Sequence, residues 1–152
     1  MRSNTAFART FLDESPESIL TTVKFFDTGV DEQSGIIMKN TKDQMVVMAL
    51  SMRAKQPKRD VVSGTKGYVE INHYPRATEA DITYTASAHE EKHDKITAGD
   101  SDKALEYEVQ DMQRYIDQGH DDGQLQMSHD IAHILTSVRT SWGMKYPFDD
   151  EK

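Results

Sequence analysis

Cysteine is absent from the 152 residues, which excludes a disulfide framework, a catalytic thiolate and a thiolate-bound metal. The sequence also lacks an apolar run of about 20 residues, so we expect no membrane-spanning helix. Basic residues are scarce. The 18 Lys and Arg against 26 Asp and Glu leave a net charge of -8, which disfavours binding to nucleic acid or anionic lipid. With no cysteine and no apolar leader at the start, we expect a cytoplasmic location.

The remaining composition is typical of one folded domain, since 36% of the residues are hydrophobic and no low-complexity segment occurs. A short helix is expected over residues 6–12, before Pro16. Segments rich in β-branched and aromatic residues then predict strands at 19–26, 33–39, 45–52, 60–63, 68–71, 82–85 and 92–97.

Two apolar stripes at helical spacing predict two helices near the end of the chain. The first stripe consists of Leu105, Val109, Met112 and Ile116, and the second of Ile131, Ile134, Leu135, Val138 and Trp142. Strands followed by helices indicate an α+β fold, with a mainly antiparallel, open-faced β-sheet and helices packed on one of its faces. We expect the segment 6–12 to be loosely held, because a short isolated helix is marginal in water.

The segment 45–52 has two apolar faces. Val46, Met48, Leu50 and Met52 alternate with Met45, Val47 and Ala49. The helices can cover only one face, so we expect the other to mediate homo-oligomer formation. Alternatively, the second face belongs to a central strand that is merely less well covered.

Two histidine pairs suggest metal binding. His89-Glu90-Glu91-Lys92-His93 fits the H-E-x-x-H motif, but no apolar helical stripe surrounds it, so we expect a charged turn between edge strands instead. His129 and His133 are also spaced for one helix face, where they could bind a metal, act as acid and base, or simply face solvent. No third ligand is evident, and we predict no metal site.

Nucleotide-binding motifs are absent. No G-x-G-x-x-G occurs, and Gly64-Thr65-Lys66-Gly67 lacks phosphate-loop spacing and precedes a strand, so its glycines are expected in a tight turn. No Ser/His/Asp arrangement has a nucleophile elbow around it. We therefore assign no catalytic and no cofactor-binding residue in this chain.

Five segments, read in order, resemble one family. They are Ala6-Phe7-Ala8-Arg9 with Pro16-Glu17-Ser18-Ile19; Thr28-Gly29-Val30-Asp31-Glu32; Gly64-Thr65-Lys66-Gly67-Tyr68-Val69-Glu70-Ile71; Tyr107-Glu108-Val109; and Gly143-Met144-Lys145-Tyr146-Pro147-Phe148. Together they resemble the C-terminal domain of the glucose–fructose oxidoreductase / inositol dehydrogenase / MocA family (Gfo/Idh/MocA), in its dihydrodiol dehydrogenase-like branch.

The resemblance implies a parent NAD(P)-dependent dehydrogenase that acts on a sugar, polyol or related secondary alcohol, with NAD or NADP held by an N-terminal Rossmann domain. Residues 1–152 then form a single C-terminal sheet domain that starts within the helix preceding the sheet. The family's catalytic Tyr or His position falls near Ser3 and its catalytic Asp before Met1. We therefore expect a substrate-binding and oligomerisation domain that is inactive alone and whose partner is the missing Rossmann domain.

The family often places an aromatic side chain near the substrate just after the G-T-x-G strand. Tyr74 is the candidate for this position, and an ordinary loop tyrosine is the alternative. For the whole chain, the alternative function is a stand-alone, sheet-mediated interaction module without enzymatic activity.

Overall fold

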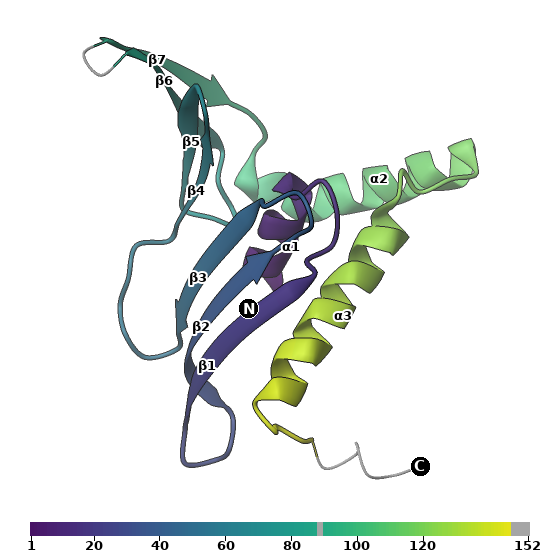
Figure 1. The fold of residues 1–152 in the computed structure, drawn as a ribbon. Coiled ribbons are helices and arrows are strands. Elements are labelled where there is room, and N and C mark those ends of the chain that lie inside the picture. Colours follow the sequence, from purple (N-terminus) through teal and green to yellow (C-terminus); the bar gives the residue numbers. More distant parts are fainter. Residues whose placement is uncertain (88–89, 147–152) are drawn as a thin grey trace. The chain divides into compact units, whose positions relative to one another are not determined.

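The computed structural model of the chain describes residues 1–87 and 90–146. In chain order its elements are α1 (Arg2–Phe11), β1 (Ser18–Phe25), β2 (Asp31–Lys39), β3 (Met45–Ser51), β4 (Arg59–Gly64), β5 (Gly67–Asn72), β6 (Glu79–Ser87), β7 (Glu90–Thr97), the 3₁₀ turn η1 (Ser101–Lys103), α2 (Ala104–Gln118) and α3 (Gln124–Ser141) (Figure 1). The predicted α+β class is confirmed, and every strand pairing in the described residues is antiparallel.

The chain divides into two compact units. The first contains Met1–Gln56 and the segment from Gly123 onward, and the second contains Pro57–Asp122. Each unit has its own sheet, with strand orders β1-β2-β3 and β4-β5-β6-β7. The strands lie close to their predicted positions, but the sequence did not reveal the division into two sheets. The boundary between the two units lies in the polar connection from β3 to β4, at Pro57. Because proline has no backbone N–H, it cannot donate a hydrogen bond to a neighbouring strand.

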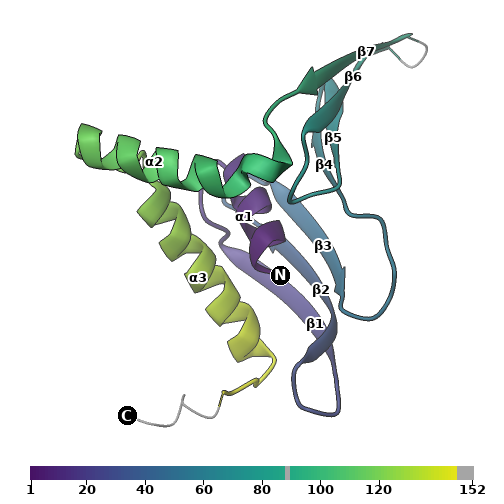
Figure 2. The same ribbon diagram turned by 180° about the vertical axis from the view of Figure 1, so that it is seen from behind.

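The core of the first unit lies between the inner face of its sheet and two helices (Figure 2). Its buried cluster consists of Ala8 from α1, Ile36, Met38 and Met48 from the sheet, and Ile134 and Val138 from α3. Trp142 packs against this cluster and donates a hydrogen bond from Nε1 to Thr21 Oγ1 at 2.9 Å. The second predicted helix therefore packs on the sheet, as its stripe indicated.

The loosely held helix expected over residues 6–12 is not what the structure contains. Thr5, Ala8 and Leu12 are buried, and α1 packs beside α3. Tertiary burial stabilises a ten-residue helix that would be marginal alone. In this unit α1 also covers part of the sheet. The sequence predicted that covering role for the helix with the first apolar stripe, which is α2.

The outer face of the same sheet carries an apolar row. Leu20, Ile37 and Val47 are directly opposite one another on the three strands. Their exposed fractions are 68%, 41% and 70%, and Met45 beside them is 63% exposed. On the other face of β3 Met48 is buried, whereas Met52 of the same alternating set lies beyond the end of the strand and is 82% exposed. We call this exposed surface, formed by Leu20, Ile37, Met45, Val47 and Ala49, the outer sheet face.

The second unit contains the four-stranded sheet, η1 and α2. Gly64 and Gly67 pair across the β4–β5 turn, as expected from their spacing. Gly67 has a φ of 149°, and a Cβ there would lie 2.0 Å from the carbonyl oxygen of Thr83, so only glycine fits. Helix α2 ends at Gly119, whose φ of 71° is typical of a left-handed cap.

A search for membrane-spanning helices in the described part of the chain found none of sufficient length and apolarity.

Candidate functional site

A groove of about 390 Å³ lies within the first unit. One wall is formed by residues 15–17 and the start of β1, and the other by one face of α3. Its lining residues are Ser15, Pro16, Glu17, Ile19, Gln126, His129, Asp130, His133, Ile134, Ser137 and Ser141. Pro16, Ile19 and Ile134 contribute apolar surface to the groove, and the other lining residues are polar.

Asp130 joins the parts of this groove. Its carboxylate accepts hydrogen bonds from Arg9 Nε at 2.9 Å and from Gln126 Nε2 at 2.8 Å, and Ser15 also donates to it. Burial acts to raise the pKa of Asp130, but the three hydrogen bonds and the charge of Arg9 outweigh it, so the pKa lies below its ordinary value. The α1 helix, the groove wall and α3 are thus held by one ionised carboxylate.

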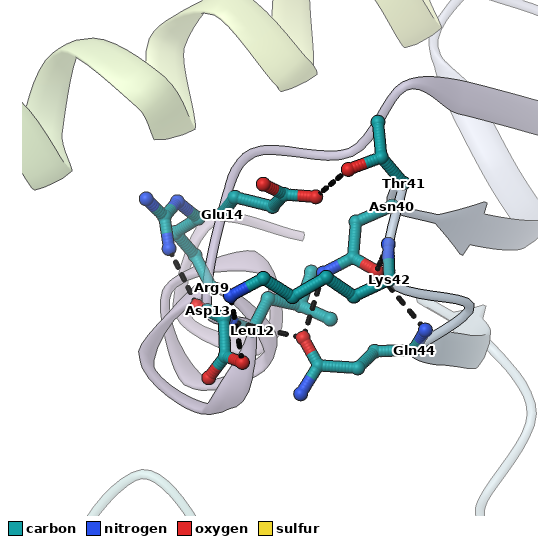
Figure 3. A network of polar contacts seen from close by, with 8 residues as sticks. All are labelled: Arg9, Leu12, Asp13, Glu14, Asn40, Thr41, Lys42 and Gln44. Carbon is teal, nitrogen blue, oxygen red and sulfur yellow. Dashed lines mark hydrogen bonds and ion pairs between the residues drawn. The ribbon is translucent and has the colours of Figure 1, made fainter.

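The segment leading from α1 into the groove wall is fixed by a polar network (Figure 3). Asn40, which is buried, accepts backbone hydrogen bonds from Lys42 and Gln44 at 3.1 and 3.0 Å and so closes the β2–β3 turn. The Gln44 side chain then accepts from the Asp13 backbone N–H at 3.0 Å. Further contacts link Thr41 with Glu14 and Lys42 with Asp13. The groove wall therefore starts from an immobilised segment.

His129 and His133 lie one turn apart on α3, and both line the groove. Both are exposed, and Glu17 belongs to the opposite wall. Within residues 1–87 and 90–146 no three His, Asp or Glu side chains are arranged to hold a metal ion. The groove instead offers imidazoles, hydroxyls and carboxylates together with three apolar side chains, a combination that can hydrogen-bond a small hydroxylated molecule.

Tyr74 lies in the second unit, in the loop after β5, and forms a cis peptide bond with Pro75. The side chain is half-buried, and burial together with the negative charge of Asp60 raises the pKa of its phenol above the ordinary value. The phenol therefore stays protonated at neutral pH and can act as a hydrogen-bond donor.

The first histidine motif is not helical where the structure describes it. His93 lies in β7, where its Nδ1 is 3.1 Å from Thr83 Oγ1. His89 lies outside the described residues, as do Pro147 and Phe148 of the C-terminal motif. Ser3, at the position expected for a proton-transfer residue, lies exposed in α1.

Sequence reasoning missed Asp130, Ser15 and Glu17 as groove residues. The only local signal was the i,i+4 spacing of Gln126 and Asp130, and nothing local indicates that Asp130 meets Arg9, 121 residues away. A Rossmann-type dinucleotide site is built on a parallel β–α–β unit with a glycine-rich turn, whereas every strand pairing in the described residues is antiparallel.

Comparisons with known proteins found a likeness in structure but none in sequence. No protein-family model matches the chain, and no curated protein matches it by sequence. Among solved structures, the chain is similar to UDP-N-acetylglucosamine 3-dehydrogenase GnnA from Acidithiobacillus ferrooxidans, with a TM-score of 0.72 and 12% sequence identity. The match covers 92% of this chain and 45% of that one, so the chain spans less than half the length of the matched structure. At this identity the likeness establishes the fold alone.

Proposed function

We propose that the chain is the substrate-binding domain of an NAD(P)-dependent oxidoreductase that acts on a sugar, polyol or related secondary alcohol. The observation that carries the proposal is the structural match. Nearly all of this chain corresponds to less than half of a protein named as a sugar-nucleotide dehydrogenase. The five ordered motifs of the sequence support the same family, and they favour its dihydrodiol dehydrogenase-like branch. The lack of cysteine supports a cytoplasmic location.

The proposal assigns the chain one part of the reaction. Hydride transfer requires a nicotinamide held against the substrate carbon, and the cofactor supplies that chemistry. Because every strand pairing in the described residues is antiparallel, unlike the parallel unit of a Rossmann-type site, we assign NAD or NADP to a separate Rossmann domain. The chain would bind and orient the alcohol, with Tyr74 as a donor to it, and would be inactive alone.

The outer sheet face supports a second element of the proposal, self-association. Its central row of Leu20, Ile37 and Val47 is exposed, and burying such a surface contributes about 25 cal/mol per Å². A two-fold arrangement would let the same face serve both partners. The same observation favours the second candidate function, a non-enzymatic module that associates through this face.

The purified chain is expected not to bind NADH or NADPH, because its described elements include no strand–glycine-rich turn–helix unit of the kind that holds the pyrophosphate in Rossmann domains. Isothermal titration calorimetry with each nucleotide measures this directly. The fluorescence of the single tryptophan, Trp142, in the same sample serves as the folding control, since this residue packs on the core of the first unit. Binding of either nucleotide with micromolar affinity would contradict the proposed division between two domains.

A further inference from the structure

Helix α2 carries an apolar stripe that the second unit leaves uncovered. Leu105, Val109, Met112 and Ile116 are 71%, 58%, 59% and 71% exposed, and α2 has no buried residue. The contact that attaches the helix lies elsewhere. Tyr107 approaches Gly99, so that a Cβ at Gly99 would be 4.0 Å from the tyrosine ring. At 100° per residue, Tyr107 lies on the side of the helix opposite to the stripe. The stripe therefore faces away from the loop that holds α2.

The spacing of the stripe is that of a coiled-coil seam. Its four residues follow one another at intervals of four, three and four, as d, a, d and a positions do in a heptad pattern. An isolated helix of 15 residues is marginal in water, so a partner along this seam would stabilise it.

The charges beside the seam are unequally distributed. Glu106 and Glu108 occupy the two flanking positions in the first half of α2, whereas Gln113 and Tyr115 occupy them in the second half. If a second α2 runs antiparallel, the flanking glutamates of each copy lie against the uncharged Gln113 and Tyr115 of the other. Leu105 then packs against the partner's Ile116, and Val109 against the partner's Met112. This arrangement places no glutamate opposite another.

We propose that α2 is an interaction surface for a second copy of this chain, with the two helices packed antiparallel along the stripe. This surface is separate from the outer sheet face. A chain that associates through both surfaces forms a larger assembly than a dimer. A substitution on one surface can disrupt its association without affecting the other surface.

The absence of cysteine permits a direct test by disulfide cross-linking. Leu105→Cys protein and Ile116→Cys protein, mixed in equal amounts and oxidised, are expected to form a cross-linked dimer on denaturing gels. Each protein alone is expected to remain uncross-linked, because antiparallel packing separates the two copies of one position by about 16 Å along the helix axis. Cross-linking of Leu105→Cys protein alone would show parallel packing and overturn the proposal.

A charge in the seam provides an independent test. Val109→Glu, introduced into both cysteine proteins, is expected to reduce cross-linking by about tenfold or more, because the buried charge has no partner. Gln118→Glu adds the same charge outside the seam and should leave cross-linking unchanged. Val47→Asp on the outer sheet face should also leave it unchanged, which separates this proposal from association through the sheet. If the mixed proteins fail to cross-link while circular dichroism shows them folded, α2 binds something other than a second copy and the proposal is wrong.

Discussion

Met38→Asp is expected to unfold the first unit. Met38 is fully buried on the inner face of β2, among side chains from α1, β3 and α3. No cation lies in that cluster to pair with a new carboxylate, and an unpaired buried charge costs several kcal/mol out of a total stability of about 5–15 kcal/mol. Loss of the near-ultraviolet circular dichroism signal and a red-shifted emission from Trp142 would report the unfolding.

Val47→Asp is the matched control, since it places the same charge on the opposite face of the same sheet. Val47 is 70% exposed, so the variant is expected to stay folded. It should also lose the association mediated by the outer sheet face, which sedimentation velocity measures as a lower mass. If Val47→Asp unfolds the chain, the assignment of the two faces is wrong. If it stays folded at unchanged mass, the outer sheet face is not an association surface.

Asp130→Asn is expected to lower the free energy of unfolding by about 1–3 kcal/mol at neutral pH, the usual contribution of hydrogen bonds to a charged group. The Asp130 side chain is only 11% exposed, and its partner Arg9 is 18% exposed, so solvent does little to replace the contact. Asp13→Asn is the matched control. The side chains of Asp13 and Lys42 are each 57% exposed. Such a surface ion pair contributes about 0–1 kcal/mol to the free energy of unfolding. Urea unfolding followed by Trp142 fluorescence compares the two variants.

The contribution of Asp130 also depends on pH. Its pKa is lower in the folded chain than the ordinary 3.8, so the unfolded chain takes up the proton first as the pH falls. The stabilisation is therefore complete well above pH 3.8 and is lost as the pH falls through the lowered folded value. We expect wild-type stability to fall more steeply below about pH 4 than that of Asp130→Asn. Parallel pH profiles for the two proteins would show that Asp130 does not join α1 to α3.

Local patterns in the sequence predicted most of the elements. The alternation in β3 located the strand and distinguished its two faces, because side chains in a strand point alternately to opposite sides. The stripe of α3 likewise predicted which face packs on the sheet. In contrast, the packing of α1 and the exposed stripe of α2 were not predicted. An apolar stripe indicates a helix but does not say which helix finds a partner within the chain.

The groove was harder to predict than the elements that form it. The spacing of His129 and His133 was visible in the sequence, but their neighbours come from residues 15–19, more than 100 positions earlier. The buried Asn40 that organises the adjoining turn has no distinctive motif, since its partners Lys42 and Gln44 are common surface residues. Contacts between residues so far apart in the sequence arise from the packing of α3 beside β1. Local sequence patterns do not reveal them.

The central claim is that this chain provides only the substrate side of a dehydrogenase, and the coding sequence upstream of the Met1 codon tests it most directly. Sequencing that region in the gene is expected to reveal an adjoining segment that encodes a strand, a G-x-G-x-x-G turn and a helix, followed by a Glu-Lys-Pro motif. An independent translation start at Met1, with no such segment next to it, would contradict the claim and favour the interaction module.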